Sequence, residues 1–387
     1  MTALRLPPPL ALYIHIPWCA RKCPYCDFNS HEARAAIPET DYVNALILDL
    51  EQALPLIWGR KIISVFFGGG TPSIFSPDAI ERILSAVRAR TPLIYDAEIT
   101  LEANPGIADE ARFAGFRDAG VNRLSLGIQS FNDRHLAALG RIHNAAQARS
   151  AADIALKTFG RVNFDLMYAL PQQTLDEALD DARAAIALNP SHLSCYHLTL
   201  EPNTPFHRAP PPLPDDDTGA TMQESLENLL ADAGYRHYET SAFAGEKNAH
   251  QDNRCRHNLN YWQFGDYLGI GAGAHSKLTL PDRIIRQSRY KHPASYLQKT
   301  ATGEHIEQEQ TLRRDDLAFE FMMNALRLTE GFETALFEER TGLPLTAVSK
   351  PLRDAETLGL LQQTATKITP TLRGQRYLNE LLQMFLG

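Results

Sequence analysis

Cysteine is scarce in this sequence, and long apolar runs are absent. Only five of the 387 residues are cysteine, which is too few for a disulfide-stapled fold and, being odd, fits a reducing compartment. The longest apolar runs, such as Ile62–Phe67, have the length of a strand and fall far short of the ~20 residues that cross a bilayer. No secretory signal pattern precedes the first cysteine. We therefore expect a soluble, cytoplasmic protein. Hydropathy does not exclude peripheral contact of a helix face with a membrane.

Basic residues are also in the minority. Lys and Arg number 38 against 46 Asp and Glu, which gives a formal net charge of -8. Nucleic-acid binding normally needs clustered Lys and Arg, and no basic stripe is evident, so we expect no nucleic-acid partner. The chain is long enough for one large α/β domain and a smaller one.

Three of the five cysteines lie together in the stretch YIHIPWCARKCPYCDFNSH, with the spacing Cys19-x-x-x-Cys23-x-x-Cys26. Iron–sulfur clusters are bound by cysteine thiolates, so this loop can hold three irons of a [4Fe-4S] cluster. The fourth iron is then open to the amino nitrogen and carboxylate oxygen of S-adenosylmethionine (SAM), whose carbon–sulfur bond one electron can split. This spacing is the hallmark of the radical SAM superfamily, which the chain resembles.

A zinc site is the main alternative to the cluster. Zinc sites normally draw two pairs of ligands from separate positions, and no second Cys-x-x-Cys is present. His250, Cys255 and His257 form another candidate zinc set, but their spacing also lacks a paired knuckle. A disulfide is disfavoured in a reducing compartment. The sequence therefore predicts a [4Fe-4S] cluster, with its three metal ligands in the cysteine loop.

Six apolar segments alternate with helical patterns and predict six parallel strands in series. The segments are Leu10–Ile16, Ile62–Phe67, Ala97–Glu102, Arg123–Gln129, Val162–Tyr168 and His192–Leu200. Helix starts support the alternation, because Ser76 precedes a proline at the first helical position and Thr174 forms a capping box with Glu177. Periodicity leaves open whether the sheet closes partly or stays flat. The superfamily resemblance implies an α/β fold, a partial (βα)6 TIM-like barrel with its site at the C-terminal ends of the strands.

Glycine-rich or polar motifs follow several of these strands. Gly68-Gly69-Gly70-Thr71-Pro72 follows the second strand, where glycine lets the backbone approach a bound molecule, although such a run can equally be a tight turn. Glu102 ends the third strand and can either bind ribose hydroxyls or be solvated or ion-paired. Asp165 lies in an apolar strand and needs a partner. Arg141 is a candidate for a structural salt bridge with it.

Together these segments resemble the oxygen-independent coproporphyrinogen III dehydrogenases (HemN) and their haem-chaperone relatives, over essentially the whole chain. The resemblance implies contacts with SAM at Tyr13, Tyr25, Gly69, Gly70, Thr71 and Glu102. It also implies that Gln129, Arg141 and Asp165 match polar residues that surround a second SAM molecule in the dehydrogenase.

Two departures separate the relatives. Phe28 stands where the dehydrogenase has a further cysteine, and only 18 residues precede Cys19, so the long N-terminal arm of the dehydrogenase is missing. Both features are those of the haem chaperones.

The chaperones also carry an HNxxYW signature, matched here by His257-Asn258-x-x-Tyr261-Trp262. A histidine can ligate haem iron and aromatic rings can line an apolar macrocycle site. Tyrosine and tryptophan beside a strand more often simply pack, and a lone histidine seldom ligates. The resemblance implies His257, Tyr261 and Trp262 as haem-binding residues.

The sequence pattern changes in the last third of the chain. The glycine-rich segment 269–276 lacks the G-x-G-x-x-G spacing of a dinucleotide loop, so we expect close backbone packing near the barrel opening. Beyond it the sequence predicts helices and a hairpin-like LLQQTATKITPT, a small, mainly helical C-terminal domain of winged-helix character. We expect it to pack over the barrel instead of binding DNA, because it is not strongly basic. The expected helices are Leu312–Leu328, Phe332–Arg340, Leu345–Leu358 and one from Leu372.

Three regions follow from these patterns. We predict a radical SAM partial barrel over residues 1–205, an extension carrying the HNxxYW motif over 206–310, and the C-terminal domain over 311–387.

Two classes of function are consistent with the motifs. The first is a haem chaperone that binds haem and transfers it to acceptor haemoproteins, with a [4Fe-4S] cluster, SAM and an electron donor such as flavodoxin or ferredoxin. The second is an enzyme, either an oxygen-independent coproporphyrinogen III dehydrogenase or a radical SAM methyltransferase. Phe28, the short segment before Cys19 and the HNxxYW motif favour the chaperone. No catalytic residue is therefore predicted.

Overall fold

A single curved sheet organises the larger part of the chain. The computed structural model describes residues 6–246 and 252–386, and within them twelve strands form one sheet in the order β14-β13-β12-β11-β1-β4-β5-β6-β7-β8-β10-β9. The central six strands are parallel. They are β1 (Leu10–Ile16), β4 (Ile62–Gly69), β5 (Leu93–Ala103), β6 (Arg123–Gln129), β7 (Val162–Tyr168) and β8 (His192–His197).

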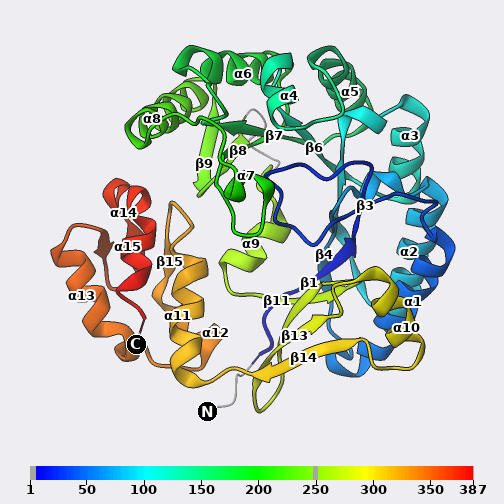
Figure 1. The fold of residues 1–387 in the computed structure, drawn as a ribbon. Coiled ribbons are helices and arrows are strands. Elements are labelled where there is room, and N and C mark those ends of the chain that lie inside the picture. The colour runs from blue at the N-terminus through cyan, green and yellow to red at the C-terminus, as the bar shows by residue number, and fades with distance from the viewer. Residues whose placement is uncertain (1–5, 247–251, 387) are drawn as a thin grey trace.

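Helices cover the outer face of this sheet (Figure 1). They are α1 (Glu39–Ile57), α2 (Pro77–Arg90), α3 (Glu110–Ala119), α4 (Asp133–Ala138), α5 (Ala145–Thr158), α6 (Leu175–Leu188) and α8 (Asp216–Asp232). The predicted starts are observed, because Ser76 caps α2 and Thr174 forms a capping box with Glu177 at the start of α6. The partial βα barrel that the sequence predicted is confirmed.

The strands turn apolar side chains toward the helices and polar ones toward the inside of the curve. In β7, Val162, Phe164 and Leu166 belong to the main hydrophobic core. Asn163 and Asp165 alternate with them and hydrogen-bond to each other. This period of two is the ordinary alternation of a strand. The concave side of the sheet is therefore polar, which suits a bound molecule better than a packed core.

The sheet is twice as wide as the sequence predicted, because strands from the middle of the chain extend both edges. One edge carries β11 (Asp266–Ile270), β12 (His275–Thr279), β13 (Ile284–Arg289) and β14 (Ile306–Thr311), of which β11 pairs in parallel with β1. The other carries β10 (Ala242–Gly245) and β9 (Tyr235–Glu239). These strands lack an apolar run: β14 is IEQEQT and lies largely exposed, and the segment after β11 is rich in glycine.

Asp49 of α1 holds this extension against the barrel. It is fully buried and accepts hydrogen bonds from the Gly271 amide at 3.1 Å and the Tyr296 hydroxyl at 2.9 Å. It also pairs with Arg289 at 3.2 Å and lies 3.2 Å from His305. A buried carboxylate needs such partners. The network fixes the glycine-rich turn, where a Cβ on Gly271 would lie 2.4 Å from the His15 carbonyl oxygen, as expected for close backbone packing.

Shorter elements complete the barrel. They are β2 (Trp18–Cys19), β3 (His31–Glu32), α7 (Pro205–Arg208), α9 (Arg256–Trp262), α10 (Pro293–Ala301) and the single turns Pro72–Ile74 and Pro105–Ile107. Helix α9, which carries the HNxxYW motif, lies inside the curve of the sheet and not among the outer helices (Figure 1).

The C-terminal segment forms a separate hydrophobic cluster beside the open side of the barrel (Figure 1). Its three strands pair in the order β15-β17-β16. The expected hairpin is β16–β17, whereas Phe332, expected to begin a helix, starts the short strand β15. The elements are α11 (Arg314–Ala325), β15 (Phe332–Glu333), α12 (Thr334–Thr341), the turn Leu345–Val348, α13 (Ser349–Thr357), β16 (Leu361–Gln363), β17 (Lys367–Pro370), α14 (Leu372–Arg376) and α15 (Leu378–Gln383).

Candidate functional site

The cysteine loop follows β1 and lies over the C-terminal ends of the parallel strands. Trp18 anchors its start, with its ring 4.8 Å from that of Tyr42 and 6.1 Å from that of Phe75. Asn29 anchors its end by donating to the Ala272 carbonyl at 2.9 Å. The loop is thus clamped between α1, the turn after β4 and the turn after β11.

A cavity of about 380 Å³ opens beneath this loop and gathers most of the predicted cluster and SAM residues. Those that line it are Cys19, Cys23, Tyr25, Cys26, Gly69, Gly70, Thr71, Glu102, Gln129, Arg141 and Asp165. They come from the loop and from β4, β5, β6, β7 and the turn after α4. We call this space the cluster cavity.

The three cysteines of the loop are free thiols with an environment suited to metal binding. Burial raises the pKa of Cys19 and of Cys26, so a bound cation would be needed to keep these thiols deprotonated. Arg141 donates to the Cys23 sulfur at 3.6 Å and offsets negative charge there. Cys195 lies in β8 and Cys255 caps α9. Neither lines the cluster cavity.

Within the two described ranges no three His, Cys, Asp or Glu side chains are close enough to hold a single metal ion. In a [4Fe-4S] cluster each thiolate binds its own iron, so the three sulfurs need not converge on one point. His250, part of the candidate zinc set, lies outside the described residues.

The glycine motif joins the cysteine loop to the sheet. The Gly70 amide donates to the Ile16 carbonyl and the Thr71 amide to the Trp18 carbonyl, each at 2.8 Å. A Cβ on Gly70 would lie 2.5 Å from the Trp18 carbonyl oxygen, a distance that real structures do not tolerate. Gly69 has φ +118°, which favours glycine. Because glycine has no Cβ, the backbone of the cysteine loop can approach at these positions. The same absence leaves the backbone of Gly69 and Gly70 accessible from the cluster cavity.

Glu102 lies between the cluster cavity and a second cavity and lines both. Burial, and then the nearby Asp165 carboxylate, raise the pKa of Glu102 to about 8. Among the described residues no ion pair engages it. Of the two structural alternatives that the sequence left open, the ion pair is therefore not observed among the described residues, and the half-buried side chain borders both cavities.

The suggested salt bridge between Asp165 and Arg141 is wrong. Asp165 instead accepts hydrogen bonds from Ser125 at 3.0 Å and Asn163 at 2.8 Å. Arg141 donates to the Gly127 carbonyl at 2.9 Å as well as to Cys23. Neutral donors from β7 itself and from the neighbouring β6 thus hydrogen-bond to the carboxylate, and the guanidinium contacts the cysteine loop.

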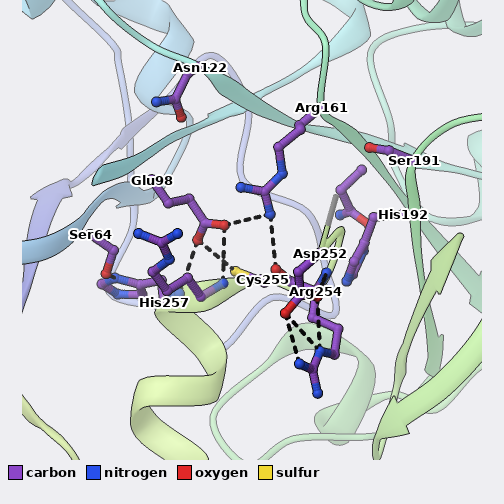
Figure 2. A network of polar contacts seen from close by, with 12 residues as sticks. Ser64, Glu98, Asn122, Arg161, Ser191, His192, Asp252, Arg254, Cys255 and His257 are labelled. Atoms are coloured by element: carbon purple, nitrogen blue, oxygen red, sulfur yellow. Dashed lines mark hydrogen bonds and ion pairs between the residues drawn. The ribbon is translucent and has the colours of Figure 1, made fainter. Parts of the chain in front are cut away.

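A buried carboxylate, Glu98 of β5, holds the HNxxYW helix inside the barrel (Figure 2). It accepts the amide hydrogens of Arg256 and His257 at 3.1 and 3.0 Å and pairs with Arg161 at 2.8 Å. Burial opposes ionisation of Glu98, but Arg123, Arg161 and the two amides outweigh it and lower its pKa. An anion at a helix N-terminus is stabilised by the helix dipole. Glu98 was not singled out from the sequence, where it is one acidic residue in an ordinary strand.

The imidazole of His257 is engaged on both sides. Its Nδ1 lies 3.0 Å from the Ser64 hydroxyl and its Nε2 lies 3.2 Å from the Tyr261 hydroxyl. The ring also stacks on Phe66, with centroids 4.9 Å apart. Burial lowers the pKa of His257 to about 3, so the ring is neutral. Trp262 points elsewhere, with its ring 5.1 Å from the guanidinium of Arg327 beyond α11.

The comparisons with known proteins match both parts of the chain. The Radical SAM superfamily model matches residues 13–185, and the HemN C-terminal domain model matches residues 312–377. "Heme chaperone HemW" of Escherichia coli K12 is 48% identical over 385 residues, covering 98% of this chain and 99% of the relative. "Heme chaperone HemW" of Haemophilus influenzae is 50% identical over 388 residues, covering 98% of each. The chain belongs to the HemW family of radical SAM proteins.

The similarity extends to animals and to a solved structure. A bovine protein named "Radical S-adenosyl methionine domain-containing protein 1, mitochondrial" is 35% identical over 97% of this chain and 87% of its own. The structure of coproporphyrinogen III oxidase (HemN) from E. coli superposes with a TM-score of 0.82 at 23% identity, covering 98% of this chain and 90% of that one. At this identity the match shows the shared fold. Across residues 6–246 and 252–386, no helix has the length and apolar character to cross a membrane.

A second cavity, of about 660 Å³, adjoins the cluster cavity in this HemW-family fold. The two share the walls formed by Asp27, Phe28, Gly69 and Glu102. Tyr13, predicted beside SAM, and Tyr261 of the HNxxYW motif line the second cavity. The structure therefore brings Tyr13, His257 and Tyr261 together but separates Trp262 from them.

Several residues of the second cavity were missed by sequence reasoning. His15, Tyr267, His275 and Lys291 line it from β1, β11, β12 and the turn after β13. His275 lies in the glycine-rich segment interpreted only as packing, and the others carry no local motif. Their common position could be found only by pairing β11 with β1, which brings residues far apart in sequence to one sheet edge.

Proposed function

We propose that this chain is a haem chaperone that carries a [4Fe-4S] cluster and SAM and transfers haem to acceptor haemoproteins. The observation that carries the proposal is identity of 48–50%, over nearly the full length, with proteins named heme chaperone HemW. Phe28 in place of a further cysteine, and the HNxxYW motif on α9, support the same function against that of the dehydrogenase. The fold is common to both and does not discriminate.

Cys19, Cys23 and Cys26 would hold three irons of the cluster, since all three thiols face the cluster cavity. The bound cluster and SAM would together supply one-electron chemistry at this place. Gly69, Gly70, Thr71 and Glu102 would position the amino-acid and ribose parts of SAM. Tyr13 and Tyr25 would flank them.

Other residues of the cluster cavity have supporting roles. Arg141 would stabilise the Cys23 thiolate through the hydrogen bond described above. Gln129 and Asp165 line the far side of the cavity, where a second SAM molecule would have to bind. A flavodoxin or ferredoxin would deliver the electron at the loop, where Phe28 is exposed.

Haem ligation by His257 remains a prediction. In the observed geometry it would require breaking the contacts with Ser64 and Tyr261. Tyr261 is better placed, because it lines the second cavity. His257 would then act on haem through Tyr261, as a positioning residue.

The function is tested with anaerobically reconstituted protein, by titration with haemin and by product analysis after incubation with coproporphyrinogen III, SAM and reductant. We expect about one haem bound per chain and no protoporphyrinogen IX. Transfer is then measured by mixing the haem-loaded chain with an apo-haemoprotein and following its spectrum. Robust decarboxylation of coproporphyrinogen III, or failure to bind haem, would overturn the proposal.

The cluster assignment is tested by substitution of cysteines. Cys195→Ala combined with Cys255→Ser should keep about four irons and four sulfides per chain, because both residues lie outside the cluster cavity. Serine at 255 keeps a donor toward Glu98, which Cys255 contacts at 3.5 Å. Cys23→Ser should lose most of the iron. Loss of the cluster in the double variant would show that the ligand set is wrong.

A further inference from the structure

The second cavity has the size of a cofactor site, and none of Cys19, Cys23 and Cys26 lines it. Its volume of about 660 Å³ lies within the ~300–1,000 Å³ typical of small-molecule and cofactor pockets. It is lined by Tyr13 of β1, Tyr267 of β11 and Tyr261 of α9, and by Phe28 of the cysteine loop. Phe28 is 61% exposed, so its apolar ring face is available to a planar molecule bound in the cavity.

Three histidines line this cavity, and they differ in what their ring nitrogens contact. Both nitrogens of His15 are engaged, by the Tyr13 hydroxyl at 3.1 Å and the Asn29 carbonyl at 2.8 Å. The Nε2 of His31 is buried without a partner and so does not face the open space. His275 is exposed at the start of β12. Among the described residues, no hydrogen bond is seen to its imidazole.

His275 is also electrically suited to metal ligation. Partial burial of its ring, followed by the positive charges of Lys291, Arg286 and Arg289, lowers its pKa. The ring is therefore neutral near pH 7 and offers a nitrogen lone pair to iron.

The cations around His275 are not equivalent. Arg289 is committed to Asp49 and Arg286 to Glu320, whereas Lys22 donates to two loop carbonyls, those of Phe28 and Ser30. Within the described part of the chain, the ammonium group of Lys291 has no ion-pair partner, and Lys291 lines the cavity. A lysine in this position suits a carboxylate group on a bound molecule.

We propose that the second cavity is the haem site, with His275 as an axial ligand of the iron, Lys291 paired to a propionate and Phe28 against the macrocycle. The assignment rests on the proposed haem-binding function and names its site. An iron porphyrin has the three features that the cavity matches: a metal that takes imidazole, peripheral carboxylates and a broad apolar face. The shared walls at Phe28 and Glu102 place this haem next to the cluster cavity.

The test compares haemin titrations of the cluster-loaded wild type with those of His275→Ala and His275→Met. We expect His275→Ala to weaken haemin binding at least tenfold and to shift the Soret band, and added imidazole to restore the wild-type band. His275→Met should give a third, distinct spectrum. Both variants should keep the wild-type iron content and far-UV circular dichroism, because His275 lies at the exposed start of β12 and does not line the cluster cavity.

Two matched variants and the wild type itself complete the test. His207→Ala removes an exposed histidine of α7 that lines neither cavity and should leave haemin binding unchanged. Lys291→Ala should weaken affinity without moving the Soret band. Wild-type spectrum and affinity in His275→Ala would overturn the site while leaving the haem-chaperone function standing. If the wild type binds no haemin, the proposed function fails and the site with it.

Discussion

Glu102 and Asp27 are the ionisable side chains that line both cavities, and the protonation of Glu102 is set by its surroundings. Burial and the charge of Asp165 raise its pKa to about 8, so the Glu102 carboxyl is mostly protonated at pH 7. Positive charge on SAM would favour the ionised form and lower this pKa. Binding of SAM then releases a proton, and affinity rises with pH until about pH 8.

We therefore expect the affinity of the cluster-loaded protein for SAM to increase between pH 6 and pH 8, by at most about tenfold per pH unit from this group. The amino group of SAM titrates near the same range, so the contribution of Glu102 is the part that disappears in Glu102→Gln. Equilibrium dialysis at several pH values measures it. Glu201→Gln, which removes another carboxylate of the cluster cavity, is the control. Identical pH profiles for Glu102→Gln and the wild type would contradict the prediction.

Phe28 is a position at which we expect this chain to use the shared fold differently from the dehydrogenases. It stands where the dehydrogenases resembled by this chain have a further cysteine, and it is exposed at the rim of both cavities. A phenylalanine there supplies no metal ligand, but it offers an apolar face to a planar molecule.

The end of β4 and the cysteine loop form one structural unit. Their backbones meet at hydrogen bonds from Gly70 and Thr71 to the loop, and a Cβ on Gly70 would clash with the Trp18 carbonyl. Because the clash is with backbone, the loop must move as a whole, and overpacking of this kind costs about 1–3 kcal/mol. The positions of the thiols depend on that contact.

Gly70→Val should therefore reduce the iron retained after reconstitution, and weaken SAM binding at least tenfold in the fraction that keeps its cluster. Iron analysis and dialysis with labelled SAM are the measurements. Gly160→Val is the matched control, because a Cβ there meets nothing within 4 Å and should leave both quantities unchanged. Full iron content and SAM affinity in Gly70→Val would show that the contact is dispensable.

The C-terminal segment is joined to the barrel by packing at a strained residue. Phe264, just after α9, belongs to the hydrophobic cluster of the C-terminal segment and is 1% exposed. Its ring contacts that of Phe321, with centroids 5.8 Å apart, and lies 4.0 Å from the Lys277 ammonium. Its φ is +53°, a conformation that costs a non-glycine residue energy. The packing outweighs this cost.

Phe264→Ala should destabilise the cluster-loaded protein by about 3–5 kcal/mol and expose the C-terminal segment to protease, as measured by urea unfolding and limited proteolysis. Phe264→Gly should be no less stable than Phe264→Ala, since glycine relieves the backbone strain. Tyr95→Ala removes a fully exposed aromatic ring and should change stability by less than about 0.5 kcal/mol. A loss below about 1 kcal/mol in Phe264→Ala would show that the junction is held elsewhere.

Local patterns in the sequence were sufficient to predict the six parallel strands, the helix caps at Ser76 and Thr174, and the cysteine loop. Each is encoded within a few neighbouring residues: alternation such as that of β7, a hydroxyl before a helix, or three thiols in one turn. The resemblance to the radical SAM superfamily, and not these local patterns, predicted that the motifs would meet at the C-terminal ends of the strands.

Local sequence patterns could not predict the contacts between segments that are far apart in the chain. Glu98 caps a helix that begins more than a hundred and fifty residues later, and Arg141 serves Cys23 instead of Asp165. Strand β11 pairs beside β1 and carries His275 toward the second cavity. The free energy of such contacts depends on burial and on which groups remain unpaired once the sheet has closed. The periodicity of a short segment contains no information about burial or unpaired groups in the folded chain. The three-dimensional arrangement alone therefore determines how the polar residues inside the barrel are paired.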